Sequence, residues 1–200
     1  MSVDFIDFVD SYVSLNPLEK MVLKQKSKVV EFKKGDIIHS VGSVCDRLYF
    51  MLEGYARGFV VDENGKDYTW TLIFNDKNSK VENLFAFDCD SFLQDTPSRI
   101  EIEALSDCKV LMFLKSDVLM LFDISKKIDR FARFMTEEAY SYLHNMILDR
   151  QTKSAKQRLE EFMQTKSHLL DIVPQYHIAS LLDITPQHLS RLKKEINIGE

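Results

Sequence analysis

The hydrophobic positions of this chain change their period twice. Between residues 4 and 26 they fall at helical spacing, in two short runs on either side of Pro17, and Asn16 is a suitable N-cap for the second run. From residue 28 to 114 the apolar residues form short runs of strand character, broken by polar turns. Helical spacing returns at residue 117. The pattern predicts two short helices, a β-rich middle and a helical C-terminal part.

The middle region predicts an antiparallel fold. Its strongest turn signal is Asn64-Gly65, between apolar runs at 55–61 and 68–74, because both residues tolerate the positive φ that tight hairpins need. Further strands are expected at 28–32, 37–39, 48–52, 99–105 and 109–114. Short strands at regular spacing, flanked by helices, indicate an α+β protein with an antiparallel sandwich or a jelly-roll-like β-roll.

After a short helix at 117–125, one long helix is predicted from Ile128 to about Asp149, since the stretch has neither Gly nor Pro. One apolar row along it has heptad-like steps of three or four residues, which predicts a homodimer seam; it consists of Ile128, Phe131, Met135, Ala139, Tyr142 and Met146. A second row, Phe134, Leu143 and Ile147, would then face the β-roll. The alternative is that one broad apolar face only covers the chain's own core.

The tail has the pattern of a helical unit. An amphipathic helix is expected at 152–166, a connection at 167–173, and two further helices at 174–182 and 186–196, joined by a tight turn. Small Ala179 suits the crossing of the last two helices, Thr185 can cap the second, and Pro186 fits its first position. This spacing predicts a helix-turn-helix.

The outward face of the last helix carries groups that can reach base edges and phosphates. The candidate DNA-contacting residues are Thr185, Gln187, His188, Ser190, Arg191 and Lys194, and Lys193 lies on the same face. Two plainer interpretations stay open. The helical hairpin can be a packing unit only, and Arg191 can form an ion pair with Glu195, four residues on.

Charge is unevenly distributed along the chain. The net charge is −5, but residues 150–200 hold eight Lys/Arg against six Asp/Glu, a balance of +2, which leaves −7 for residues 1–149. A local basic face can bind phosphate although the whole chain is acidic. Three separated cysteines predict neither a disulfide framework nor a metal site, and no signal peptide or membrane span is expected. A cytoplasmic protein fits this composition best.

Several stretches resemble the Crp/Fnr superfamily of transcription regulators, whose β-roll is the cyclic-nucleotide-binding fold. They are Lys34-Gly35-Asp36-Ile37-Ile38-His39, Leu48-Tyr49-Phe50-Met51-Leu52-Glu53-Gly54, Asp62-Glu63-Asn64-Gly65-Lys66, Ile102-Glu103-Ala104-Leu105, Cys108-Lys109-Val110-Leu111 and the tail from Val173 to Lys194. The resemblance covers residues 15–198. It implies a β-roll with N-terminal helices at 1–126, a dimerisation helix at 127–149 and a DNA-binding domain at 150–200. It also implies a regulator that binds a double-stranded DNA operator as a homodimer, with RNA polymerase as a further candidate partner.

The region of the family's nucleotide site departs from the family pattern. Nucleotide-binding members present a Phe-Gly-Glu segment and then an Arg-Ser pair to the cyclic phosphate and ribose; here residues 84–92 contain no Gly, and the later pair reads Ser98-Arg99. A close backbone approach to phosphate is harder without Gly. We therefore expect no cyclic nucleotide, and an effector, if there is one, of another kind. Asp90, Ser98 and Arg99 are the candidate pocket residues.

Other functions are less well supported by the residues. An iron–sulfur sensor would need an N-terminal cysteine cluster, which the sequence lacks. A haem ligand stays open, with His39 the only histidine of the roll. No catalytic constellation or metal-ligand cluster is recognisable, so an enzyme is not expected. Only about four residues follow Ile196, so no full wing is expected beside the helix-turn-helix. The remaining alternatives are a ligand-independent DNA binder and a small-molecule sensor whose helical tail binds protein.

Overall fold

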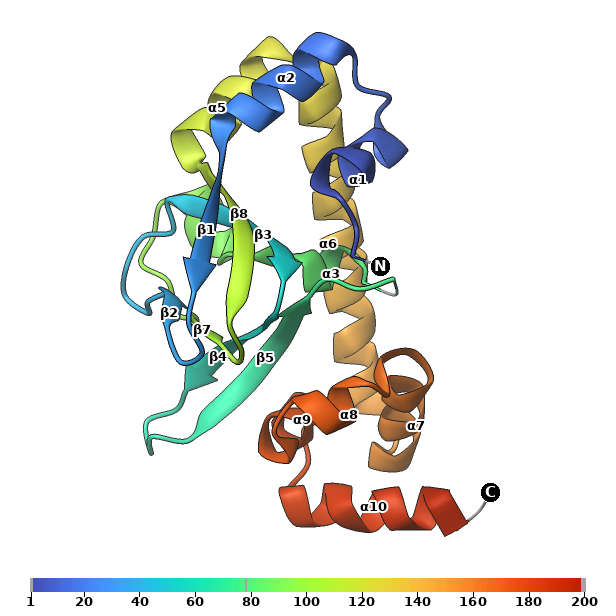
Figure 1. Cartoon of the computed structure of the whole chain (residues 1–200). Coiled ribbons are helices and arrows are strands. Elements are labelled where there is room, and N and C mark those ends of the chain that lie inside the picture. Colours follow the sequence, from blue (N-terminus) through green and yellow to red (C-terminus); the bar gives the residue numbers. More distant parts are fainter. Residues whose placement is uncertain (1, 78, 199–200) are drawn as a thin grey trace.

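Two four-stranded antiparallel sheets form the β-roll. The computed structural model describes residues 2–77 and 79–198, with side chains described up to Ile196. The first sheet has the order β1 (Ser27–Phe32), β8 (Cys108–Leu114), β3 (Arg47–Glu53), β6 (Phe85–Ala86). The second has the order β2 (Ile37–His39), β7 (Glu101–Ala104), β4 (Tyr55–Val61), β5 (Asp67–Phe74). The predicted α+β class with an antiparallel roll is confirmed (Figure 1).

Strands β4 and β5 form the predicted hairpin, but the turn is longer than a two-residue one. Only Gly65 has a positive φ, of 78°, and Asn64 does not. The loop is closed at its base, where the Asp62 N–H donates to the Lys66 carbonyl at 2.9 Å, and the Asp62 carboxylate accepts from the N–H groups of Asn64 and Lys66. An Asx-type turn with one left-handed glycine therefore replaces the expected pair of positive-φ residues.

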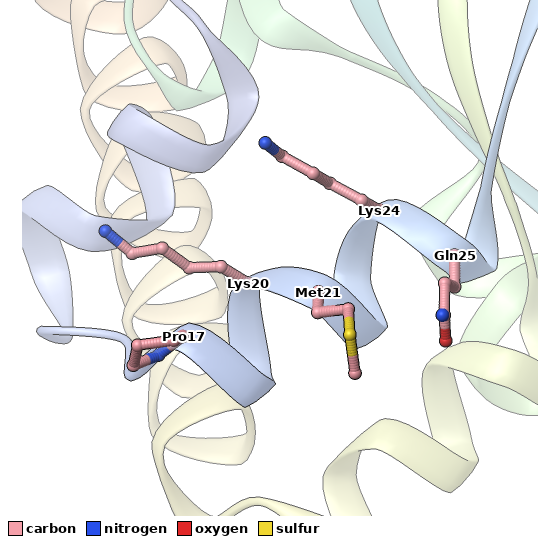
Figure 2. A pocket seen from close by; sticks show the side chains of 5 residues that line it. All are labelled: Pro17, Lys20, Met21, Lys24 and Gln25. Carbon is pink, nitrogen blue, oxygen red and sulfur yellow. The ribbon is translucent and has the colours of Figure 1, made fainter.

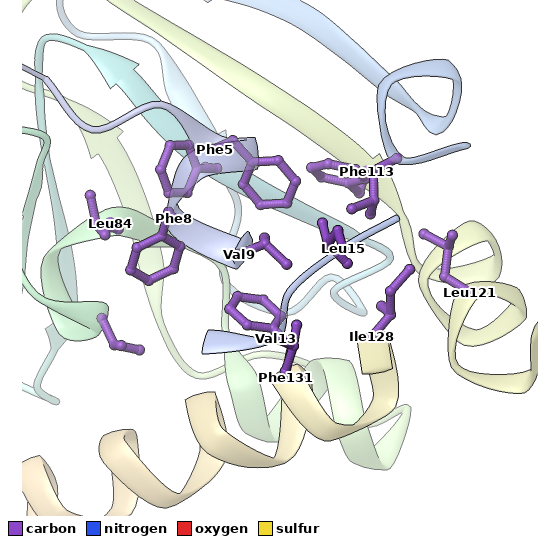
Figure 3. Close-up of a cluster of buried hydrophobic side chains, with 13 residues drawn as sticks. Phe5, Phe8, Val9, Val13, Leu15, Leu84, Phe113, Leu121, Ile128 and Phe131 are labelled. Atoms are coloured by element: carbon purple, nitrogen blue, oxygen red, sulfur yellow. The ribbon is translucent and has the colours of Figure 1, made fainter. Parts of the chain in front are cut away.

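The N-terminal helices close one end of the roll. Helix α1 (Phe5–Tyr12) begins at Asp4, whose carboxylate accepts two backbone N–H groups, and α2 (Pro17–Lys26) has the predicted Asn16 cap with Pro17 in first position. Aromatic rings of α1 lie against the first sheet and the long helix in one buried cluster (Figure 3). Its buried members are Phe5, Phe8, Val9, Val13, Leu15, Leu23, Phe50, Val81, Leu84, Phe113, Leu121, Ile128 and Phe131.

The remaining helices connect the roll to the tail. Short α3 (Val81–Leu84) and α4 (Cys89–Gln94) lie between β5 and β7, and α5 (Lys115–Ile124) leads into the long helix α6 (Lys126–Thr152). The tail consists of α7 (Ala155–Lys166), α8 (Leu169–Ile172), α9 (Gln175–Leu181) and α10 (Pro186–Ile198). The connection expected at 167–173 is therefore wrong in part, since it holds the single turn α8. In Figure 1, α6 runs beside the roll and ends at the tail helices.

The predicted dimer seam has to be corrected at its start. Ile128 and Phe131 are 5% and 8% exposed and belong to the chain's own buried cluster, with Met135 packed against it. The second row was expected to face the roll, but its last residue, Ile147, is 56% exposed. Periodicity separates two rows on a helix but does not say which row faces the core, and here Phe134 of the second row packs against the same cluster as Met135 of the first.

Candidate nucleic-acid interface

Helices α9 and α10 are joined by a closed turn that fixes their angle. Asp183 adopts the left-handed conformation, with φ 55°, immediately after α9. The N–H of Ile184 donates to the Ala179 carbonyl at 2.9 Å and the N–H of Asp183 to that of Ser180 at 3.0 Å. These two bonds make a Schellman motif, which satisfies carbonyls that the end of a helix leaves without partners. Aspartate occupies the position where glycine is commonest.

The start of α10 follows the sequence prediction. Thr185 Oγ1 accepts a hydrogen bond from the His188 N–H at 3.2 Å, and Pro186 is the first helical residue. Leu189 and Leu192 are 0% and 5% exposed, and they share a buried cluster with Ile178 and Ala179 of α9. One face of α10 is therefore fixed against α9, which leaves the opposite face turned outward.

The outward face of α10 holds most of the predicted DNA-contacting residues. Gln187, Ser190, Arg191 and Lys194 are exposed, and His188 is half-buried. The Arg191 side chain is 69% exposed, and its Nε lies 3.7 Å from Glu195 Oε1, which is the ion pair that the sequence left open. Exposed pairs of this kind contribute about 0–1 kcal/mol, so the guanidinium can leave Glu195 at little cost.

A shallow polar depression lies between the start of α9 and α10. It is lined by Gln175, Ser190, Lys193 and Lys194. Two ammonium groups, a hydroxyl and an amide in one depression can hold a phosphate oxygen. Gln175 was absent from the predicted contacts, because it precedes α10 by eleven positions and only the packing of the two helices brings it there.

Arg158 of α7 is another residue that the sequence did not single out. Its Nε and Nη2 donate to the Leu182 carbonyl at 3.2 and 3.1 Å, and its Nη1 donates to the Lys153 carbonyl at 2.7 Å. The guanidinium thus lies at the C-terminal end of α9, where a positive charge is favourable to the helix dipole. Arg158 ties α7 to the turn between α9 and α10.

The candidate effector residues do not form an open pocket together. Ser98 is 3% exposed, and its Oγ donates to Asp88 Oδ2 at 2.6 Å, whereas Asp90 and Arg99 are both exposed. Asp88 is itself buried, and its Oδ1 accepts from the N–H groups of Asp90 and Ser91 as the cap of α4. A carboxylate of the chain therefore occupies the start of α4. The sequence missed Asp88, although its position just before α4 is a capping signal.

Several residues of the same segment are buried as well. Leu84 and Ala86 are both 0% exposed and Phe92 is 4% exposed. Cys45 and Cys108 are buried, which raises the pKa of both thiols, and Cys89 lies at the surface. His39 is half-buried on β2, and burial lowers the pKa of its ring. Within the described parts of the chain, no three His, Cys, Asp or Glu side chains gather as metal ligands.

A second surface depression lies on α2, at the opposite end of the molecule from α10 (Figures 1 and 2). It is lined by Pro17, Lys20, Met21, Lys24 and Gln25, all from this one helix. Lys20 pairs with Asp10 at 2.7 Å. Neither this depression nor the one at α10 involves the segment around Asp88. No described helix combines the length and the apolarity that a membrane crossing requires.

Comparison with known proteins agrees with this architecture. Residues 29–125, which make up the roll, match the family model of the cyclic nucleotide-binding domain. No curated protein sequence matches the chain.

Solved structures extend the likeness to most of the chain. FixK2 from Bradyrhizobium japonicum is 15% identical with a TM-score of 0.72, over 86% of this chain and 85% of that one. A protein assigned to the Crp/Fnr family of transcriptional regulators, from Eubacterium rectale, is 15% identical with a TM-score of 0.68, over 92% and 85%. The catabolite activator protein of Thermus thermophilus is 17% identical with a TM-score of 0.52, over 92% and 85%. The chain therefore has the fold of the Crp/Fnr regulators.

Proposed function

We propose that the protein is a homodimeric, sequence-specific DNA-binding transcription regulator of the Crp/Fnr type. The observation that carries the proposal is α10, which buries Leu189 and Leu192 against α9 and turns Gln187, Ser190, Arg191 and Lys194 outward. Between residues 186 and 196 the helix has three Lys/Arg and one Glu, so this face is basic in an otherwise acidic chain. An exposed basic helix held by a closed turn fits the major groove.

Each outward residue has a role that follows from its chemistry. Arg191 would hold the O6 and N7 atoms of a guanine, which is worth about 1–3 kcal/mol of discrimination, and Gln187 would read a neighbouring base. Thr185, His188, Ser190 and Lys194 would contact phosphates or add a base contact. In a dimer, two such helices would enter successive major grooves about 34 Å apart on a near-palindromic operator.

The dimer seam is proposed on the open side of α6. Tyr140, Ile147 and Leu148 are 71%, 56% and 46% exposed, and the Tyr140 and His144 rings stack with centroids 6.1 Å apart. Of the predicted seam, Ala139, Tyr142 and Met146 are half-buried, and they would border the revised seam rather than form its centre. Sedimentation of Ile147→Glu should give a monomer where the wild type gives a dimer. A dimer that persists in Ile147→Glu places the interface elsewhere.

Control by cyclic AMP is not part of the proposal. Asp88 holds a carboxylate at the start of α4 and accepts the Ser98 hydroxyl, so a phosphate entering there would meet a negative charge. Arg99, the only arginine of segment 84–99, is exposed. The regulator either takes another effector or acts without one.

The decisive experiment is selection from a randomised duplex-DNA pool with the purified protein, with the affinity for the enriched sequence measured at two salt concentrations. The proposal expects a near-palindrome with half-sites one helical turn apart and an affinity that falls steeply with salt. A pool without enrichment, with and without added metabolite extract, would contradict the proposal. It would favour the second candidate, a small-molecule sensor whose helical tail binds protein. The net charge of −7 in residues 1–149 supports this candidate.

A further inference from the structure

The outer face of the second sheet is covered by the tail. Leu72 and Phe74 of β5 are 3% and 1% exposed and share one buried cluster with residues of α7, α8, α9 and α10. Members of that cluster from the tail include Leu159, Phe162, Leu169, Ile178, Leu189 and Leu192. No strand lies among the described residues 150–198, so it is a strand of the roll that packs beside α9 (Figure 1). The two parts therefore share one core.

Polar contacts add direction to this shared core. The Thr69 N–H donates to Ser180 Oγ at 2.9 Å, and Thr69 Oγ1 lies 3.4 Å from His177 Nδ1. His177 is 1% exposed, and its neighbour Ile178 is fully buried. Hydrogen bonds depend on orientation where apolar contacts do not, so these two contacts fix how α9 lies along β5.

Thr69 is in turn held from the side of the roll. Arg57 Nη1 donates to Thr69 Oγ1 at 3.2 Å, which leaves the single hydroxyl hydrogen for His177 Nδ1. Arg57 is 5% exposed and lies between two carboxylates, Asp67 and Glu103, each at 2.6 Å. A buried guanidinium with three fixed partners has little freedom to move.

This row of contacts begins next to the candidate effector segment. Glu103 belongs to β7, which starts two residues after Arg99, and Ser98 in the same segment holds Asp88. A continuous series of contacts therefore leads from Glu103 through Arg57 and Thr69 to α9, whose closed turn fixes α10.

We infer that Thr69, supported by Arg57, is the residue that positions α10, the proposed recognition helix. It acts through its contacts with His177 and Ser180 of α9. The inference rests on the proposed function and adds to it the element that sets the orientation of α10 on DNA. Strand β5 of the roll takes the place that a wing strand next to the helix-turn-helix would have. The orientation of α10 is then set by the roll, independently of the seam on α6.

The test compares three variants of the full chain. Thr69→Val removes the hydroxyl that joins Arg57 and His177, and Ser180→Ala removes the acceptor of the Thr69 N–H. Thr165→Val is the matched control, because Thr165 is exposed and its hydroxyl bonds only to Glu161 of its own helix. Each protein is titrated with three duplexes: the selected operator, the operator with one base pair added between half-sites, and one isolated half-site.

A positioning role predicts a specific pattern. Thr69→Val and Ser180→Ala should bind the full operator about threefold to tenfold more weakly, as expected for one lost hydrogen bond, and should discriminate less against the altered spacing. Their affinity for the half-site should equal that of the wild type, because the face of α10 is unchanged. An equal loss on the half-site, or no loss on any duplex, overturns the inference.

Hydrogen exchange separates this inference from the proposed function. If the wild type binds none of the duplexes, the proposed function fails, whereas the contact with β5 can still be measured. The inference expects faster exchange of the α9 amides in Thr69→Val and Ser180→Ala than in Thr165→Val, at a temperature below the unfolding transition of all three variants. Exchange that is identical in all three variants overturns it.

Discussion

Segment 84–99 of the roll and the pair α9–α10 differ in what they offer to a ligand. At the start of α4, Asp88 is buried and its hydrogen bonds go to Ser98, Asp90 and Ser91 within the chain. On α10, by contrast, Arg191 and Lys194 are exposed, and Arg191 forms only the weak ion pair with Glu195 among the described side chains. In the first region the buried polar groups Asp88 and Ser98 bond to the chain itself, whereas the second region presents its charged groups to solvent. The difference is the reason why we propose DNA, rather than a cyclic phosphate, as the ligand.

The position of α9 and α10 nevertheless depends on their packing against the roll, and a substitution in the shared core would measure this dependence. Phe74→Ala should lower the free energy of unfolding by about 3–5 kcal/mol, because Phe74 is 1% exposed. Phe113→Ala should lower the free energy of unfolding by about the same amount, because Phe113 is 2% exposed in the cluster formed by α1, the first sheet and α6. At a temperature where both variants are folded, only Phe74→Ala should lose affinity for the operator. Equal DNA binding in both would show that α10 does not depend on β5.

The contact between β5 and α9 should be sensitive to acid. Burial, and then the positive charge of Arg57, lower the pKa of His177 to about 4, and the ring is therefore neutral in the folded protein. The stability it contributes is fully present above pH 6.5 and is lost as the pH falls toward 4, by about 3 kcal/mol.

Chemical denaturation across this pH range measures the effect. His177→Asn keeps an acceptor near the position of Nδ1 but does not titrate, so its unfolding free energy should fall less between pH 6.5 and 4 than that of the wild type. His188→Asn, measured without DNA, is the control, since the His188 side chain lies on the outward side of α10. If His177→Asn and the wild type have the same pH dependence, His177 is not buried as a neutral ring.

Two substitutions on α10 separate base reading from phosphate contact. Arg191→Ala should relax the preference at one operator position by about 1–3 kcal/mol. Lys194→Ala should weaken binding to all DNA sequences alike. It should also reduce the slope of log affinity against log salt concentration by about 1. Lys156→Ala, on the exposed side of α7 beside Glu160, is the control and should change neither. Unchanged specificity in Arg191→Ala would remove the base contact assigned to it.

The smallest effect is expected in segment 84–99, where Asp88 caps α4. Asp88→Asn should lower the unfolding midpoint by about 2–4 °C, since it weakens a buried helix cap and the bond from Ser98. Asp4→Asn changes an equivalent but exposed cap, that of α1, and should have less effect. Addition of cyclic AMP should leave the midpoint of the wild type unchanged. A midpoint that rises with cyclic AMP would break the comparison between the two regions.

Local sequence signals were sufficient to predict most of the helices and strands. Asn16 with Pro17 begins α2, and Thr185 with Pro186 begins α10, as their capping chemistry predicts. Alternating and helical periods located the strands and the longer helices, because burial of one face requires a fixed spacing. The outward residues of α10 followed from the same period once its buried leucines were identified.

Contacts between distant segments could not be read from the sequence. Which row of α6 faces the core depends on where α1 and α3 pack, so Ile128 and Phe131 were assigned to the wrong side. Arg57 and Thr69 meet within the β4–β5 hairpin, but His177 is 108 positions from Thr69 and reaches it only when the tail lies on β5. The sequence by itself determined the helix-turn-helix and the strands of the roll except the two-residue β6, because caps, turns and periods are local. Only the tertiary structure decided which strand supports α9 and that Asp88 closes the start of α4, because those contacts are formed by the fold as a whole.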